Sequence, residues 1–190
     1  PSQNIPYNPF MSPFGGVDPE SEMDGIRAKD MAVYVGQNTT YFLPRFKIFQ
    51  KKEKAFDFNW SAFIFGPFYF MFRKMWKYAI IAGVIMLALE LPSIPYSIQV
   101  MTSMLQGTAT PVISNTVNII FTVLSFLSFV FRFCMGFFCN RLYMKHVFSR
   151  IHTLQQQYQQ DPHTAVLNSE SEYYKALVKK GGISKVSCLV

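Results

Sequence analysis

The sequence has few charged residues. Asp, Glu, Lys and Arg make up 15% of its 190 residues, against roughly 25% in an average soluble domain. Half of the residues are hydrophobic and 17% are aromatic. Between Tyr78 and Phe131, the only Asp, Glu, Lys, Arg or His residue is Glu90. This composition excludes a disordered chain and an ordinary soluble domain, and it predicts segments embedded in a membrane.

Catalytic and metal-binding signatures are also missing. The sequence has no Cys-x-x-Cys pair, no phosphate-binding Gly-rich loop, no Gly-x-Ser-x-Gly elbow and no His-Glu-x-x-His. The three cysteines, Cys134, Cys139 and Cys188, are an odd number and imply no disulfide framework. Neither Cys134 with Cys139 nor His146 with His152 has the helical spacing of metal ligands. We therefore expect no enzymatic activity, no cofactor and no metal.

The charges that do occur are mostly basic and flank the apolar segments. The formal net charge is +7, but the basic residues do not form a face on a soluble fold, so we expect no nucleic-acid partner. Residues 45–77 contain eight Lys or Arg and residues 132–150 contain four, whereas the segment between them has none. By the positive-inside rule, both ends of the chain face the cytoplasm, which requires an even number of spans.

The chain is predicted to consist of a two-span membrane module with shorter regions on either side. The first 20 residues hold five of the eleven prolines and show no hydrophobic period, which is typical of a flexible linker. The predicted regions are a Pro-rich linker (1–26), a cytoplasmic helical segment (27–55), the membrane module (56–150) and a cytoplasmic tail (151–190). The tail is predicted to contain one short helix over residues 169–180.

The helical segment before the membrane module is predicted to hold two short helices. The first covers residues 27–35 and ends at Gly36. The second covers residues 39–50, with Asn38 as its N-cap. Pro44 should bend or limit this second helix, because proline removes a backbone donor from the helix interior.

Residues 58–76 are the most aromatic part of the chain, with nine aromatic side chains in nineteen positions. Trp and Tyr favour the headgroup zone of a bilayer, and Arg and Lys side chains can extend toward it from the apolar region. The run before Gly66-Pro67 is too short to span a bilayer. We therefore expect an interfacial or re-entrant helix that breaks at Gly66-Pro67 and leads into the first span.

Two apolar stretches are long enough to cross a bilayer. The first span is predicted to run from about Phe68 to Leu91, and residues 93–110 should form an uncharged outer loop. The second span is predicted over residues 111–131, with Pro111 suited to the first helical position.

Arg132 leaves the end of the second span open. If the span ends near Leu142, Arg132 lies near the middle of the bilayer, at a cost of about 2.5–3.5 kcal/mol unless it finds a partner. If the span ends near Phe131, Arg132 lies at the interface and meets lipid phosphate. Arg132 is thus a possible intramembrane or interface contact, and we expect Arg132→Leu to leave insertion intact.

Two motifs on either side of the apolar block carry a resemblance to a known family. Phe-Asn-Trp, Gly-Pro and Arg-Lys-Met-Trp occur in order before the spans, and Asn-Arg-Leu-Tyr occurs after them. The chain resembles, over roughly residues 41–150, a family of small bacterial membrane proteins known only as a domain of unknown function. The resemblance implies a bacterial cytoplasmic membrane protein and brings no known reaction, cofactor or catalytic residue. The predicted membrane-interface residues are Asn59, Trp60, Gly66, Pro67, Arg73, Lys74, Trp76, Asn140, Arg141 and Tyr143.

The sequence favours a non-enzymatic role. We expect an accessory or scaffolding subunit of a larger membrane assembly, because two spans bury little surface against each other and tend to associate with further helices. The expected partners are the lipid bilayer and either other membrane subunits or further copies of the chain. The alternative is a small oligomeric channel or transporter component, for which Asn118, Thr122, Ser125 and Ser128 offer only a thin polar stripe.

Overall fold

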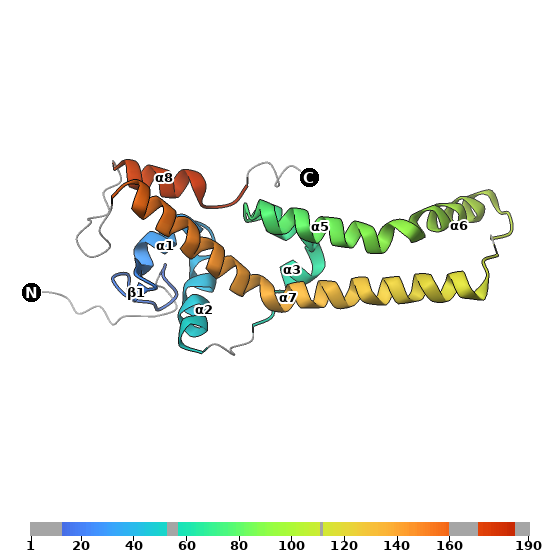
Figure 1. The fold of residues 1–190 in the computed structure, drawn as a ribbon, viewed down its shortest axis with the longest axis horizontal. Coiled ribbons are helices and arrows are strands. Elements are labelled where there is room, and N and C mark those ends of the chain that lie inside the picture. The colour runs from blue at the N-terminus through green and yellow to red at the C-terminus, as the bar shows by residue number, and fades with distance from the viewer. Residues whose placement is uncertain (1–12, 53–56, 111, 160–170, 185–190) are drawn as a thin grey trace, which may run out of the picture. The chain divides into compact units, whose positions relative to one another are not determined.

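The computed structural model describes residues 13–52, 57–110, 112–159 and 171–184, and these residues are mostly helical (Figure 1). The prediction of a helical protein is confirmed. The chain divides into two compact units: unit 1 contains residues 1–58, 71–75 and 138–190, and unit 2 contains residues 59–70 and 76–137.

Unit 1 contains an ordered β-hairpin in a region that the sequence predicts to be linker. Strand β1 (Glu22–Met23) pairs with β2 (Ile26–Arg27) in antiparallel register. Asp24 and Gly25 connect them with positive φ angles of 54° and 70°, which a two-residue type I′ turn requires. This turn brings Met23 and Ile26 into the core. The prediction of a flexible linker is therefore wrong for residues 22–26, which belong to the hairpin. Residues 1–12 lie outside the described residues.

Helices α1 (Ala28–Val35) and α2 (Thr39–Lys51) match the two predicted helices to within one residue at each end. Asn38 adopts a left-handed conformation and makes no side-chain cap, so the predicted capping role is wrong. Pro44 does not limit α2. The helix continues because its later turns are packed: Phe42, Phe46 and Phe49, at i, i+4 and i+7, are all buried.

The tail helix is α8 (Glu172–Lys180), close to the predicted 169–180. The Ser171 hydroxyl caps it by accepting a hydrogen bond from the Tyr174 N–H at 3.1 Å. Its buried side, which includes Tyr173 and Leu177, packs against α1 within unit 1.

The aromatic segment forms two short helices, α3 (Trp60–Phe65) and α4 (Pro67–Phe72). The break predicted at Gly66-Pro67 is confirmed, since Gly66 has a φ of 53° and Pro67 begins α4. The first long apolar helix, α5 (Trp76–Glu90), starts eight residues later than the predicted Phe68. The reason is a second turn at residues 73–75, where Lys74 has a φ of 58°.

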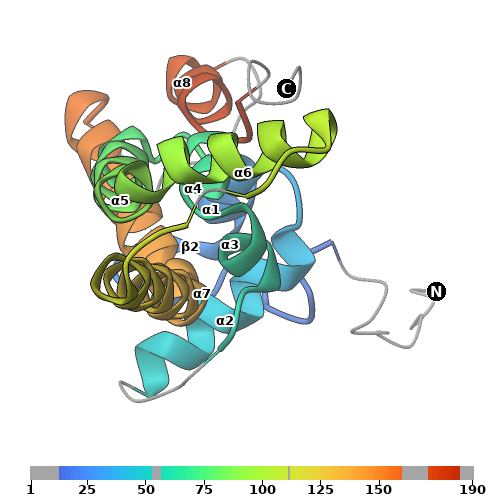
Figure 2. The same ribbon diagram turned by 90° about the vertical axis from the view of Figure 1, so that its right-hand side faces the viewer.

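The predicted outer loop over residues 93–110 is mostly helix. A 3₁₀ turn, η1 (Leu91–Ser93), leads into α6 (Ile94–Gln106), whose axis departs from that of α5 (Figure 2). The loop prediction is wrong because Pro92 and Pro95 stand in the first turns of η1 and α6, where a missing backbone N–H leaves no hydrogen bond unmade.

Helix α7 (Asn115–Gln157) is continuous through Arg132, so it contains residues 115–131 of the second predicted span and continues well beyond them. Pro111, the predicted first residue of that span, lies outside the described residues. The stretches Trp76–Gln106 and Asn115–Gln157 are both long and apolar enough to cross a membrane. In Figures 1 and 2, α5 and the first half of α7 run side by side.

Candidate functional site

A polar cluster links the two apolar helices of unit 2. The Arg132 guanidinium on α7 donates from Nη2 to Glu90 Oε1 on α5 at 3.0 Å, and the Ser128 hydroxyl donates to the same oxygen at 2.9 Å. Glu90 follows Met86 by four residues, on the side of α5 that also buries Ala79 and Ala82. These three polar residues therefore connect α5 to α7 directly.

This cluster bears on the two positions that the sequence leaves open for Arg132. A first span over 68–91 would place Glu90 at its outer end, and a second span over 111–131 would place Arg132 at the inner end, on the other side of the bilayer. The 3.0 Å contact places the two residues beside each other, which agrees with the other register, in which the second span ends near Leu142. The difference follows from the later start of α5 and from the continuation of the apolar stretch into α6. Arg132 thus has a carboxylate partner in its own chain.

The first half of the sequence motif shapes the elbow between α3 and α4. The Asn59 side chain caps α3 by accepting from the Ala62 N–H at 3.0 Å, and its amide donates to the Tyr69 hydroxyl at 3.0 Å. Its backbone N–H donates to the Gly136 carbonyl on α7 at 2.9 Å. A Cβ at Gly66 would come within 3.3 Å of Met86 Sδ and 3.4 Å of Met135 Cε, so the elbow lies against both α5 and α7.

Arg73 and Tyr143, one from each half of the motif, meet in the core of unit 1. Arg73 is only 3% exposed, and its guanidinium carbon lies 4.5 Å from the Phe42 ring centroid and 5.3 Å from that of Tyr143. Its Nη1 donates to the Gln37 carbonyl at 3.4 Å. Aromatic stacking suits a weakly hydrated guanidinium that is removed from water. Arg73 therefore acts as a core residue of unit 1.

Asn140 is the centre of a second buried contact in unit 1. It is fully buried, and its amide donates to Asp57 Oδ2 at 2.7 Å and to the Tyr41 hydroxyl at 3.0 Å. Arg45 completes the group by pairing with the same Asp57 oxygen and by lying over the Tyr41 ring, 3.4 Å from its centroid. The contact joins three parts of unit 1 into one packed group: helix α2, helix α7 and residue Asp57, which precedes α3.

The remaining motif residues lie nearer the surface. Lys74 donates to the backbone carbonyls of Lys179 and Gly181 at the end of α8, and Arg141 lies over the Phe49 ring at 5.5 Å. Trp60 is 68% exposed and Trp76 is also exposed. Contact with a membrane interface thus remains a prediction for the two tryptophans, whereas the buried members of the motif, Asn59, Gly66, Arg73, Asn140 and Tyr143, hold the fold together.

A third polar cluster was not predicted from the sequence. Asp30 on α1 is 1% exposed, pairs with Arg27 at 3.5 Å and accepts a hydrogen bond from the Tyr173 hydroxyl of α8 at 3.3 Å. Burial raises the pKa of the Asp30 carboxyl, and the nearby Arg27 charge partly opposes this shift. Asp30 and Tyr173 are 143 positions apart, so no local pattern in the sequence indicates their contact.

The raised pKa of Asp30 predicts a pH-dependent stability. Between the ordinary pKa of an aspartate and its raised value in the folded chain, the folded state binds a proton that the unfolded state has lost. The free energy of unfolding should therefore fall as the pH rises through this window. Near-ultraviolet circular dichroism of urea unfolding, from about pH 4 to 7, should show this slope, and Asp30→Asn should flatten it. The exposed control Glu172→Gln should keep the wild-type slope, and an unchanged slope in Asp30→Asn would contradict the assignment.

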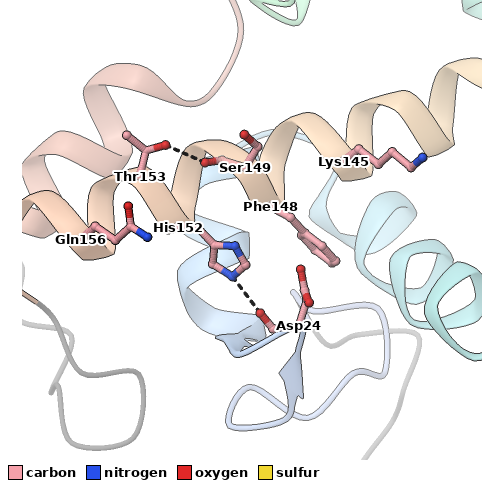
Figure 3. Close-up of a pocket in the computed structure, with 7 residues that line it drawn as sticks. All are labelled: Asp24, Lys145, Phe148, Ser149, His152, Thr153 and Gln156. Carbon is pink, nitrogen blue, oxygen red and sulfur yellow. Dashed lines mark hydrogen bonds between the residues drawn. The ribbon is translucent and has the colours of Figure 1, made fainter.

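An open groove in unit 1 lies between α7 and the β1–β2 turn (Figure 3). Its volume is about 460 Å³, and its lining residues are Asp24, Lys145, Phe148, Ser149, His152, Thr153 and Gln156. His152 Nε2 donates to the Asp24 carbonyl at 2.8 Å, and the Thr153 hydroxyl donates to the Ser149 carbonyl at 2.8 Å. The histidine thus connects α7 to the β1–β2 turn across the groove.

The described residues contain no group of three His, Cys, Asp or Glu side chains arranged to hold a metal ion. No curated protein and no solved structure matches the chain significantly. One family model, described as "Protein of unknown function (DUF2628)", matches residues 29–148. That range starts at α1 and ends within the second half of α7, so it includes both halves of the motif and all three residues of the Glu90 cluster. The chain therefore belongs to the DUF2628 family of proteins of unknown function.

Proposed function

We propose that the chain is a non-enzymatic accessory or scaffolding subunit of a bacterial membrane assembly, with α5–α6 and α7 providing its two spans and unit 1 remaining in the cytoplasm. The observation that carries the proposal is the exposure of large apolar side chains on both helices. Ile80, Val84 and Leu87 on α5 are each at least 60% exposed, and Phe126 on α7 is 65% exposed. Soluble monomers rarely expose continuous apolar surface on this scale, so lipid is the solvent that fits it.

Helix lengths support the same threading. The 15 residues of α5 reach about 22 Å at 1.5 Å per residue, which is less than the hydrocarbon thickness of about 30 Å. A full crossing therefore needs η1 and part of α6 as well. In this arrangement the Glu90 cluster lies inside the hydrocarbon region and not at its edge. The cytoplasmic placement of both ends rests on the basic residues that flank the spans.

The polar contacts of unit 1 favour a structural role over catalysis. Arg73 is enclosed by aromatic rings, and Asn140 and Asp30 are bonded to neighbouring side chains. Each of these groups is nearly inaccessible to a substrate. A catalytic group must instead reach a reacting atom at the wall of a cleft. We therefore assign unit 1 the task of presenting a stable surface beside the membrane.

A channel or transporter component is the second candidate. The observation that favours it is the Glu90–Arg132 pair, because ionisable residues inside membrane segments often mark an ion or substrate path. The two functions are separable in purified protein. A conducting assembly should produce ion flux across vesicles that contain this chain alone, whereas an accessory subunit should produce none and should co-purify in fixed stoichiometry with a larger membrane protein.

Membrane insertion can be tested with a pair of matched variants. Val84→Lys combined with Leu87→Lys places two charges on the exposed side of α5, each costing about 2.5–3.5 kcal/mol in hydrocarbon. This variant should move most of the chain from the alkali-resistant membrane fraction to the soluble or aggregated fraction. Val178→Lys on α8, which changes a similarly exposed apolar residue of unit 1, should leave the distribution unchanged. Wild-type chain that stays soluble without detergent would contradict the proposal.

A further inference from the structure

Helix α7 carries a line of polar side chains on an otherwise apolar segment. Asn118, Thr122, Ser125 and Arg132 follow one another at intervals of four, three and seven residues, and Phe129 occupies the remaining position of the series. We call the four polar residues the polar stripe. Spacing that alternates between three and four residues is that of a helix–helix contact with a 3.5-residue repeat. Asn118, Thr122 and Ser125 are exposed, and Arg132 is partly exposed.

Over residues 118–125, the polar stripe is distinct from the side of α7 that faces α5. Farther along the same line, α7 contacts α3 of its own chain: the Phe129 ring lies 5.9 Å from that of Phe63, and the Gly136 carbonyl accepts a hydrogen bond from the Asn59 N–H at 2.9 Å. Between residues 118 and 135, the buried positions of α7 are Ser128 and Met135, which lie roughly 80–100° around the helix from Asn118 at 100° per residue. A third side of α7, suited to lipid, carries the exposed apolar residues Ile119, Val123, Phe126 and Val130. Arg132 is the member of the polar stripe nearest the buried side, so its side chain can contact both Glu90 and a neighbouring helix.

Several polar atoms along the stripe have no partner among the described residues. Both hydrogen bonds of the Glu90 carboxylate end on Oε1, and Arg132 uses only Nη2 in its ion pair. Glu90 and Arg132 keep 45% and 33% of their side-chain surface exposed. The Asn118 and Ser125 side chains are exposed and make no hydrogen bond within the described part of the chain. In hydrocarbon, such groups are stabilised when a neighbouring helix supplies partners.

We infer that a second copy of this chain covers the polar stripe, so that two α7 helices pack against each other around a two-fold axis. The polar stripe is chemically complementary to a second copy of itself. An amide such as Asn118 both donates and accepts, so it can pair with the same residue of another copy. Each copy also brings one carboxylate and one guanidinium at the same level, so two copies form a neutral group of two anions and two cations. This inference rests on the proposed membrane insertion and adds the partner.

The first test measures association of the full chain in lipid. Copies labelled with donor or acceptor fluorophores at one terminus are reconstituted into vesicles of phosphatidylcholine and phosphatidylglycerol, and energy transfer is followed against the protein-to-lipid ratio. The wild type should give a saturable dimer curve. Asn118→Leu should weaken the apparent association about tenfold, because it removes an interhelical hydrogen bond. The lipid-side control Ile119→Leu should leave the curve unchanged, and equal effects of the two variants would overturn the inference.

The second test locates the contact. In a chain whose native cysteines are replaced by alanine, Ser125→Cys should form a disulfide-linked dimer in membranes, whereas the neighbouring Phe126→Cys should not. If donor-labelled and acceptor-labelled copies both float with the vesicles but show no energy transfer, the second copy is not the partner, while membrane insertion stands. Protein that does not float with the vesicles would instead refute the proposed function. Cross-linked species larger than a dimer would contradict the two-fold pair and favour a ring.

Discussion

Replacing Arg132 by leucine will destabilise the α5–α7 hairpin, and replacing Glu90 by leucine at the same time will restore most of the lost stability. The single change leaves the Glu90 carboxylate in an apolar setting with only the Ser128 hydroxyl to bind it. Breaking a fully buried ion pair costs about 3–5 kcal/mol. Because these side chains are a third to a half exposed, we expect a smaller loss, about 2–3 kcal/mol. The expectation from the sequence that Arg132→Leu leaves membrane insertion intact concerns insertion and not this loss of stability, and it stays a prediction.

The measurement is a double-mutant cycle on the free energy of unfolding in mixed micelles, followed by circular dichroism. The charge-exchanged chain, Glu90→Arg with Arg132→Glu, should lie closer to the wild type than either single charge reversal does. Ser125→Ala, on the polar stripe but outside the ion pair, serves as the control for changes in α7. If the effects of Glu90→Leu and Arg132→Leu simply add, the two residues do not support each other and the hairpin is held by other contacts.

Tyr143→Ala will destabilise unit 1 by about 3–5 kcal/mol, as expected for a large buried aromatic side chain. The Tyr143 side chain is nearly fully buried, and its ring lies 4.8 Å from that of Phe42 and 6.0 Å from that of Phe46. The substitution also removes one of the rings that enclose the Arg73 guanidinium. The charge would then face a cavity instead of an aromatic surface.

Trp60→Ala is the matched comparison, because it removes a larger aromatic residue of the same motif from an exposed position. It should change the free energy of unfolding by less than about 1 kcal/mol, while lowering the partitioning of the chain into vesicles. Urea unfolding monitored by aromatic circular dichroism separates the two cases. Similar losses of stability in both variants would contradict the division of the motif into core residues and interface residues.

The sequence predicts the helices of this chain better than it predicts their connections. The bounds of α1 and α2 follow from apolar spacing, and the break at Gly66-Pro67 follows from backbone chemistry. The sequence does not predict the turn at Lys74, because no residue type there indicates a positive φ, which is uncommon for lysine. The Asp24-Gly25 turn did carry a signal, since Asp-Gly is a strong hairpin dipeptide, but two-residue strands are too short to show alternation.

The candidate site shows the same limit. Glu90 and Arg132 stand out in the sequence as isolated charges, yet their pairing across 42 positions depends on where each helix starts. A shift of eight residues in the first helix decides whether they meet or lie on opposite sides of a bilayer. Arg73 posed a different problem. Its place beside a tryptophan and a lysine is typical of a membrane interface, but tertiary packing with Phe42 and Tyr143 makes it a core residue.

Side-specific labelling of two cysteines tests most directly whether the chain forms a membrane hairpin. In a background without native cysteines, Ala109→Cys lies in the connection between α6 and α7, and Val178→Cys lies exposed on α8. The hairpin predicts that a membrane-impermeant maleimide labels Ala109→Cys in intact cells and labels Val178→Cys only after the membrane is opened. Labelling of both positions from the same side would contradict it.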